Sequence, residues 1–408
     1  MTMIRDTQLT TPGIYLEEVT LQPPALFRTG VPVLVGFSHS PDMVSARDQA
    51  HPPCVRLTRW EQFAQRVGPT PSWSFLPYAV RGFFENGGEY CVVVPVPVAD
   101  NESDARTLAR RLRNVFTESA HSIREAFDDL EDVDLCCVPD LMVDSVRADA
   151  DAVVEIQHEV LQYCHDRGDW FAILDACPAE DLEAVIQHWQ ALSPTEGALY
   201  FPWILVEPLP RSSARFVPPC GHVAGIYART DTRIGVHKAP ANELIVGALD
   251  VSRQLTAEES GRLNEAGVNA LRDFLGHGIR VWGARTLSGL PNWQYVNVRR
   301  LFVSLVRWID QNMRDLTFEP HTPSLWDRVR ERLSAHCYTL FQKGALKGMS
   351  PNEAFFVKCN AETNPFAVRD AGQLICEVGL APVCPAEFLV VRVTQHAAGT
   401  TVTFPNEV

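Results

Sequence analysis

A strand-end carboxylate with histidines nearby is the arrangement in this 408-residue chain that could do hydrolytic chemistry. Asp175 lies near the end of the apolar run WFAILDAC (170–177), and His158, His165 and His188 flank it in the sequence. A carboxylate that orients a histidine can turn it into the base for a serine nucleophile. However, the chain has no GxSxG segment, and no Gly-flanked serine sits in a strand-to-helix turn that would expose it. We therefore predict that this region is not catalytic.

Other signatures of catalysis and ligand binding are also missing. The sequence contains neither GxGxxG nor GxxxxGK[ST], so it has no dinucleotide or phosphate loop. Cys164 and His165 have no second pair at the spacing of a tetrahedral metal site. The eleven cysteines include no CxxC pair, and several lie in apolar runs, where free cysteine behaves as a small hydrophobe: Cys91, Cys136, Cys137, Cys177 and Cys376. The sequence predicts no enzyme activity, no cofactor and no metal.

The elements around these residues predict an α/β fold. Near-continuous apolar strands alternate with amphipathic helices, which is typical of a parallel sheet covered on both faces. The polar strand ends, Pro139–Asp140 and Asp175, lie where such a fold usually places an active site. We expect the Pro-, Gly- and Arg-rich segment 208–237 to be an ordered loop with a short helix. The predicted strands are 31–38, the end of 77–96, 133–140, 170–177 and 200–207, and the predicted helices are 57–68, the start of 77–96, 101–130, 147–167 and 180–191.

The last third of the chain is dense in helix and strand signals. A capping box of Thr256 and Glu259 opens a predicted helix in 256–278, before a strand that begins at Ile279. The segment 295–315 is apolar almost all round, which predicts a helix buried in a core. A further helix, predicted over 324–348, carries an apolar stripe of Leu325, Val329, Leu333, Cys337 and Leu340, edged by Trp326 and Phe341.

The net charge of −14 is unevenly distributed. The first 250 residues hold 19 Lys or Arg and 35 Asp or Glu, whereas residues 251–408 hold 17 and 15. So acidic a body argues against nucleic-acid binding by that part of the chain. The split is compatible with an outer soluble surface joined to an inner surface that meets another molecule, and equally with ordinary surface charge without a partner.

Five segments follow one another in the last third of the chain: LNEAGVNALR (263–272), GIRVWGARTLSG (278–289), YVNVRRL (295–301), GALKGMSPNEAFFVKCNAETNP (344–365) and EVGLAPVCPAEF (377–388). In order and spacing they resemble the C-terminal core of contractile tail sheath proteins from myophages, R-type bacteriocins and phage-like contractile injection systems. Near the N-terminus, TPGIYLEEV (11–19) looks like the arm of that family, and KAPANELIVGALDVSRQLT (238–256) is also similar.

This resemblance implies an α/β architecture, α+β overall, in four parts. They are an N-terminal linking arm (1–22), an outer subtilisin-like α/β domain (23–241), an inner sheath core domain (242–385) and a C-terminal arm (386–408). Members of the family are not proteases. The implied function is that of a structural subunit that polymerises helically around an inner tube and contracts to drive the tube through a target envelope.

The implied partners are copies of the chain, the inner tube protein, and baseplate and tail-terminator or cap proteins. Two alternatives stay open: a non-contracting shell or terminal sheath paralogue, and an α/β hydrolase with an oligomerisation domain. The N-terminus lacks the pattern of a secretory signal, and no apolar run approaches the length of a membrane span. We therefore expect a cytoplasmic protein, assembled into a phage tail-like particle, that neither binds nucleic acid nor inserts into a membrane.

Both ends of the chain carry strand-forming residues, which predicts arms that link subunits. In a monomer such strands would be exposed edges, whereas in a polymer an extended arm can complete the sheet of a neighbour. A head-to-tail contact of this kind, if it does not close into a ring, generates a helix of subunits. The predicted arm residues are Ile14, Tyr15, Leu16, Phe388, Val390 and Arg392.

A basic row lies beside the apolar stripe of the helix predicted over 324–348. It consists of Arg328, Arg332 and Lys343. In the sheath family a helix of this domain faces the inner tube, and in some members opposite charges hold tube and sheath together. The resemblance therefore predicts that these three residues face an acidic tube surface. The alternative is a solvated helix face with ordinary charge pairs.

Overall fold

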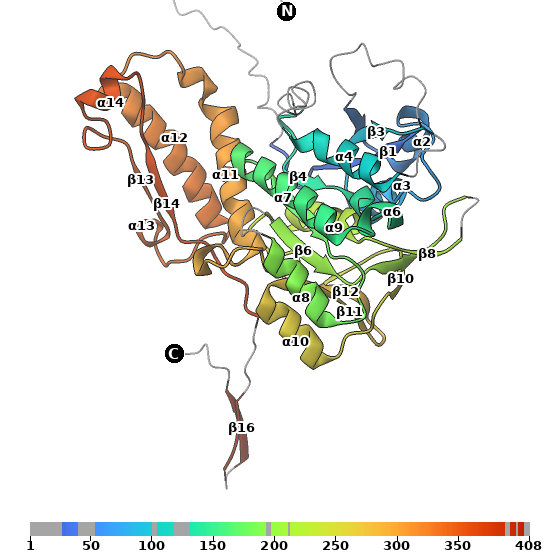
Figure 1. Cartoon of the computed structure of the whole chain (residues 1–408). Coiled ribbons are helices and arrows are strands. Elements are labelled where there is room, and N and C mark those ends of the chain that lie inside the picture. Colours follow the sequence, from blue (N-terminus) through green and yellow to red (C-terminus); the bar gives the residue numbers. More distant parts are fainter. Residues whose placement is uncertain are drawn as a thin grey trace, which may run out of the picture.

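The computed structural model shows an α/β body joined to a C-terminal module of helices and a small sheet (Figure 1). The structure describes residues 27–39, 54–99, 104–117, 127, 130–192, 197–210 and 213–387, and the backbone of 392–396 and 399–403. No helix in these ranges has both the length and the apolar content of a membrane span.

A nine-stranded sheet forms the centre of the body, in the order β2-β3-β1-β4-β5-β6-β11-β12-β9. The strands from β3 to β11 in this order run parallel, and β2, β12 and β9 are antiparallel to their neighbours. Its strands are β1 (Pro32–Ser38), β2 (Val55–Leu57), β3 (Cys91–Pro97), β4 (Leu135–Cys137), β5 (Phe171–Asp175), β6 (Gly197–Phe201), β9 (Glu243–Leu244), β11 (Val268–Phe274) and β12 (Gly278–Trp282). The central strands are buried along their length, which confirms the predicted parallel sheet.

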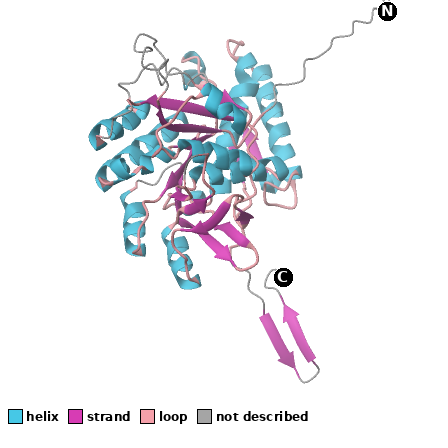
Figure 2. Ribbon diagram, turned by 90° about the vertical axis from the view of Figure 1, so that its right-hand side faces the viewer, coloured by secondary structure: helices cyan, strands magenta, loops and turns pink. Residues whose placement is uncertain are grey.

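Helices cover both faces of this sheet (Figure 2). One face carries α4 (Ala105–Phe116), α7 (Ala150–Arg167), α8 (Leu182–Ala191) and α10 (Ala257–Ala266), and the other carries α3 (Leu76–Glu85) and α9 (Cys220–Arg233). Most of the predicted helices of the body are present. The helix predicted over 57–68 is reduced to a 3₁₀ turn at Trp60–Gln62 and α2 (Phe63–Arg66), and a short helix, α6 (Asp144–Arg147), precedes α7.

The prediction of a loop with a short helix in 208–237 was wrong, because this segment contains the long helix α9, which is buried almost throughout. Two of its glycines allow it to approach α3 closely. A Cβ on Gly221 would lie 2.3 Å from the carbonyl oxygen of Ala79, and one on Gly225 would lie 2.4 Å from that of Phe83. The glycines that suggested a loop are therefore required by helix packing.

Two other predicted elements are each divided in two. The strand predicted over 200–207 consists of β6 and β7 (Ile204–Val206), and β7 belongs to a separate sheet with β8 (Arg215–Val217) and β10 (Ala248–Val251). The capping box of Thr256 and Glu259 is confirmed, but the helix predicted in 256–278 ends early, because Gly267 adopts a φ of 96° at its C-cap. The following residues form β11, so the central sheet extends past the predicted domain boundary at residues 241 and 242.

The C-terminal module is built on two long helices. The buried residues of α12 confirm the predicted apolar stripe: Leu325, Trp326, Val329, Leu333 and Cys337. The first four of these residues pack against α11 and a two-stranded sheet of β13 and β14. The elements are α11 (Val296–Met313), α12 (Pro323–Gln342), α13 (Pro351–Ala354), β13 (Phe355–Lys358), α14 (Phe366–Asp370) and β14 (Glu377–Leu380).

The helix predicted over 295–315 is present as α11, and the half before Trp308 is largely buried, but its burial does not follow the apolar side chains alone. Val306 is 46% exposed, whereas Arg300 and Arg307 are each only 2% exposed. Buried arginines require acidic or carbonyl partners, and here these partners come from other parts of the fold.

Candidate functional site

The carboxyl edge of the central sheet, where α/β proteins usually bind ligands, is filled by the N-terminus of a helix. In the sheet order, the chain continues from β1 toward β3 on one side and from β4 toward β5 on the other. Ligands of such folds usually bind at the carboxyl ends of the two strands where the direction changes, which here are β1 and β4. The fully buried carboxylate of Asp140 closes this position and accepts hydrogen bonds from Phe37 N (2.6 Å), Ser74 Oγ (2.7 Å), Phe75 N (2.5 Å) and Leu76 N (3.0 Å). Burial raises the pKa of Asp140 to about 6, and the four donors oppose this shift.

Asp175 likewise accepts a hydrogen bond at the N-terminus of a helix, in this case α9. Its Oδ1 accepts a hydrogen bond from the backbone N of Cys220, the first residue of that helix, at 2.8 Å. Burial raises the pKa of Asp175 to about 7. The structure does not assemble the candidate hydrolytic site, because His188 bonds to a glutamine of α7, His158 bonds to a carbonyl at the end of α8, and His165 is exposed. Both strand-end aspartates thus stabilise helix N-termini.

The cysteines and acidic residues offer no other chemical centre among the described residues. They contain no group of His, Cys, Asp or Glu side chains that could hold a metal ion. None of the eleven cysteines forms a disulfide, and most are buried. Of the five cysteines that the sequence placed in apolar runs, Cys91, Cys136 and Cys137 are buried as predicted, whereas Cys177 and Cys376 are only half-buried. Burial raises the pKa of the Cys337 thiol to about 11, so this group is protonated near neutral pH and is a poor nucleophile.

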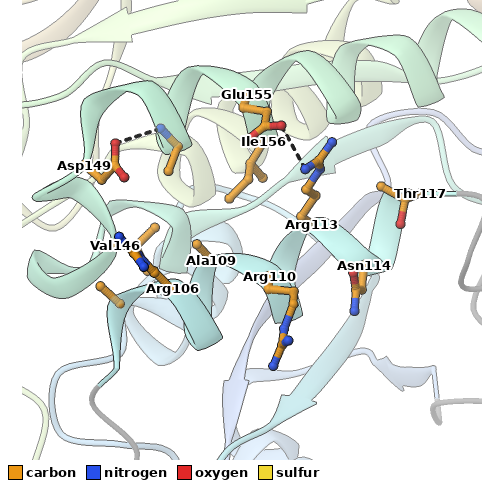
Figure 3. Close-up of a pocket in the computed structure, with 12 residues that line it drawn as sticks. Arg106, Ala109, Arg110, Arg113, Asn114, Thr117, Val146, Asp149, Glu155 and Ile156 are labelled. Carbon is orange, nitrogen blue, oxygen red and sulfur yellow. Dashed lines mark hydrogen bonds and ion pairs between the residues drawn. The ribbon is translucent and has the colours of Figure 1, made fainter.

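A groove of about 550 Å³ lies between α4 and α7 (Figure 3). Arg106 and Arg110 lie along its α4 wall, while Asp149 caps α7 by accepting from Ala152 N. Arg113 crosses the groove and pairs with Glu155 at 2.8 Å. Because the groove is open to solvent and Arg113 is already paired with Glu155, we assign no substrate site to it.

The predicted tube-facing residues lie on or beside α12, and two of them have acidic partners in the same chain. Arg332 binds the carboxylate of Asp315 through both guanidinium nitrogens, at 2.6 and 2.8 Å, and Arg328 binds Glu319 at 3.0 Å. Lys343 lies exposed at the C-cap of α12. The arginine side chains are 40% and 46% exposed, so these pairs add little stability and can exchange for another acidic partner.

The predicted arm residues fall almost entirely outside the described residues. Arg392 begins β15 (Arg392–His396), whose backbone forms an antiparallel hairpin with β16 (Gly399–Thr403). Figures 1 and 2 show this hairpin apart from the body and the C-terminal module. Within the described chain, β13 and β14 pair only with each other, so each has a free edge that could accept a strand. The arm residues outside the described ranges are Ile14, Tyr15, Leu16, Phe388 and Val390.

Sequence reasoning missed a buried charge cluster that joins the C-terminal module to the body. Arg300 binds both carboxylate oxygens of Asp231, at 2.9 and 2.6 Å, and one oxygen of Asp134 at 3.1 Å. Burial opposes the charge of Arg300, but Asp231 and Asp134 raise its pKa above the usual value. Arg307 lies two turns further along α11 and donates to the carbonyl oxygens of Arg28 and Asp132. Two arginines seven residues apart in an apolar helix were the signal available in the sequence.

Comparisons with known proteins agree with this architecture. Residues 122–287 match the phage tail sheath protein central domain, and residues 290–396 match the phage tail sheath C-terminal domain. In a solved sheath complex of an extracellular contractile injection system, PVC, in the contracted state, one chain is 30% identical, with a TM-score of 0.71. That match covers 96% of this chain and 99% of the PVC chain. The chain belongs to the phage tail sheath family.

Two further sheath proteins are similar to this family member. A chain from the helical sheath of the anti-feeding prophage in the contracted state is 27% identical, covers 95% of this chain and 99% of that one, and has a TM-score of 0.71. The tail sheath protein of Burkholderia phage BcepMu is 28% identical over 191 residues, which span 43% of this chain and only 38% of the phage protein. The two family domains meet near residue 289, after the last strand of the central sheet. The second match covers the C-terminal module, and the first covers the part of the body from residue 122 onward, without β1, β2 and β3.

Proposed function

We propose that this chain is the structural subunit of a contractile sheath, which polymerises helically around an inner tube and contracts to drive that tube through a target envelope. The observation that carries the proposal is the match over nearly the whole chain to sheath chains of two injection systems in the contracted state. The filled carboxyl edge of the sheet supports a structural role without enzyme activity or a cofactor. In this proposal residues 23–241, which hold most of the α/β body, are the outer, subtilisin-like domain.

The mechanism needs no nucleotide. A subunit that packs with its neighbours in an extended or in a more stable contracted arrangement is a two-state element, and assembly on the tube would hold it in the less stable one. Release by the baseplate would then let each ring of subunits rearrange in turn. A gain of a few kcal/mol in each subunit, summed over a long cylinder, is sufficient to move the tube.

The arms provide the connections between subunits in this proposal. The residues before Phe27 and after Glu387 would extend to neighbouring copies, where the free edges of β13 and β14 are available for strand addition. Ile14, Tyr15 and Leu16 on one arm and Phe388, Val390 and Arg392 on the other would supply the contacts. Deleting residues 1–22 or 386–408 should leave a folded monomer that no longer forms cylinders, as measured by sedimentation and electron microscopy. Cylinders of normal length from either deletion would refute this connection.

We also propose that Arg328, Arg332 and Lys343 face an acidic surface of the inner tube. The support is their exposure along one side of the C-terminal module and the ease with which exposed ion pairs exchange partners. The charge reversal Lys343→Glu should weaken assembly on the tube while the monomer still folds. Arg330→Glu is the matched control, because Arg330 lies on the same helix, is 44% exposed and pairs with Asp327. Equal effects of the two variants would contradict the proposal.

The other proposed partners follow from the sheath function: further copies of the chain, the baseplate, and a terminator or cap protein at the distal end. Assembly would take place in the cytoplasm, within a phage tail-like particle. Neither nucleic acid nor a membrane is a partner in this proposal, in keeping with the acidic composition of the first 250 residues.

A further inference from the structure

The segments that adjoin the two terminal arms both contact one helix, α11, or the residues that lead into it. We define the N-arm base as residues 27–31, which follow the N-terminal arm, and the C-arm base as residues 383–387, which precede the C-terminal arm. Each base is attached by side-chain hydrogen bonds or ion pairs to α11, to its N-cap residue or to the connection between β12 and α11.

The N-arm base is attached to the C-terminal half of α11. Nη1 of Arg307 donates to the carbonyl oxygen of Arg28 at 2.8 Å, and its guanidinium lies 5.3 Å from the centre of the Phe27 ring. Nη2 of Arg307 donates to the carbonyl oxygen of Asp132 at 2.9 Å, which ties the same side chain to the segment before β4. Since Arg307 is 2% exposed, water does not compete well for these bonds.

A second attachment lies two turns earlier on α11. Asp134 accepts hydrogen bonds from the backbone N of Gly30 (3.0 Å) and of Val31 (2.6 Å), and the same carboxylate accepts from Arg300 at 3.1 Å. Arg300 also holds Asp231 of α9 through two bonds. One carboxylate therefore joins the backbone of the N-arm base to α11.

The C-arm base is attached at the N-terminal end of the same helix. Nδ2 of Asn297 donates to the carbonyl oxygen of Val383 at 2.9 Å. Glu387 forms an ion pair with Arg285, and these side chains are only 15% and 11% exposed. The hydroxyl of Tyr295, the N-cap residue of α11, lies 3.5 Å from the same carboxylate.

We propose that α11 is a strut that carries tension between the two arms. Asn297 and Arg307 are ten residues apart, so the two attachments lie about 15 Å apart along one continuous helix. The N-arm base also continues directly into β1 of the central sheet, so α11 offers a second path beside the sheet, along which part of a pull on one arm would pass to the other arm. The inference rests on the proposed function, because only an assembly linked through its arms would apply such tension.

The chemistry of the attachments suits this task better than apolar packing would. Apolar contacts are non-directional and allow one surface to slide over another, whereas bidentate and charge-assisted hydrogen bonds fix position and direction. The guanidinium of arginine supplies several donors in one rigid plane, so a single side chain can hold two segments of backbone at once. Arg300 and Arg307 are therefore positioning residues of the strut.

Single-molecule force spectroscopy on the full chain tests the strut directly. Handles at the two chain ends pull along the strut, whereas handles at Arg59 and Leu275, both exposed residues of the body, pull along another axis. Arg307→Met should lower the rupture force severalfold relative to the wild type along the terminal axis and leave the second axis unchanged. Arg314→Met is the control, because Arg314 follows α11, is 52% exposed and forms surface pairs with Glu131 and Asp310.

An unchanged rupture force along the terminal axis, or equal losses along both axes, would overturn the inference. If Arg307→Met does not fold, Glu387→Gln tests the opposite end of the strut, with the same loss expected along the terminal axis only and the same result overturning the inference. These forces are measured on monomers, so a failure of the strut is distinguishable from a failure of the wild type to form cylinders, which would refute the sheath function itself.

Discussion

Replacing Asp140 by alanine should destabilise the body strongly, because the carboxylate is a buried acceptor for four donors. Leu76 N keeps a bond to Ser74 Oγ at 3.2 Å, so the donors left without an acceptor are mainly the backbone N–H groups of Phe37 and Phe75. Each buried orphan donor costs about 1–3 kcal/mol, and losing a negative charge at the N-terminus of α3 costs up to about 1 kcal/mol more. The expected loss in the free energy of unfolding is about 4 kcal/mol.

Equilibrium unfolding of the full chain in urea, followed by circular dichroism at pH 7.5, measures this loss. Asp144→Ala is the matched control, because Asp144 is 87% exposed and pairs only with Arg147 among the contacts of its carboxylate in the described chain. That control should change the free energy of unfolding by no more than about 0.5 kcal/mol. If Asp140→Ala costs less than about 1 kcal/mol, the carboxyl edge is not held closed by this residue, and the argument against a ligand site there fails.

Three other predictions use matched features of the chain. Gly221→Ala places a Cβ 2.3 Å from Ala79 O, so it should lower the free energy of unfolding by about 1–3 kcal/mol. The control Gly261→Ala has nothing within 4 Å of its Cβ and should raise the free energy of unfolding by about 0.5–1 kcal/mol. Similar effects of the two variants in urea unfolding would contradict the packing argument. Burial lowers the pKa of His222 to about 3, so the unfolded chain takes up this proton below pH 6.5 while the folded chain does not, and stability is lost as the pH falls. Between pH 7 and pH 5 the wild type should therefore lose about 2 kcal/mol of unfolding free energy that the variant His222→Leu does not lose. If the two proteins differ by the same amount at both pH values, this prediction is wrong. Phe318 is fully exposed at a φ of 68°, so Phe318→Gly should not lower monomer stability but should weaken polymer assembly, and unchanged assembly would show that the side chain contacts no other subunit.

The parts of the fold that the sequence predicted well are those that depend on local pattern. The apolar run of β1 needs burial on both faces whatever its neighbours are, and the sheet provides it. The capping box of Thr256 and Glu259 is a contact between residues three apart, so it could be identified without knowledge of the tertiary structure.

The errors occur where tertiary contacts decide the local structure. Gly221 in α9 is explained only by the backbone of α3, which lies far away in the sequence. Asn269 lies in β11, which pairs with β12 next to it in the sequence and with β6 some 70 residues away, and the helical pattern of the preceding segment concealed this strand. Arg300 looks like a surface residue until Asp134 and Asp231 are placed beside it.

The candidate site was predicted unevenly for the same reason. The missing nucleophile motif, a local property of the sequence, argued against a hydrolytic centre at Asp175, and in the structure this carboxylate accepts a hydrogen bond from the first residue of α9. The partners of Arg328 and Arg332 were not predicted, because Glu319 and Asp315 belong to the connection between α11 and α12, whose path depends on the packing of the two helices.

Electron cryomicroscopy of the purified full-length protein, assembled with its tube subunit, tests the central claim most directly. The sheath function predicts hollow helical cylinders in two forms, one long and narrow around a tube and one short and wide without it, with neighbouring subunits linked through residues 1–22 and 386–408. Discrete small oligomers, or cylinders with a single fixed helical geometry under all conditions, would contradict contraction as the function of this chain.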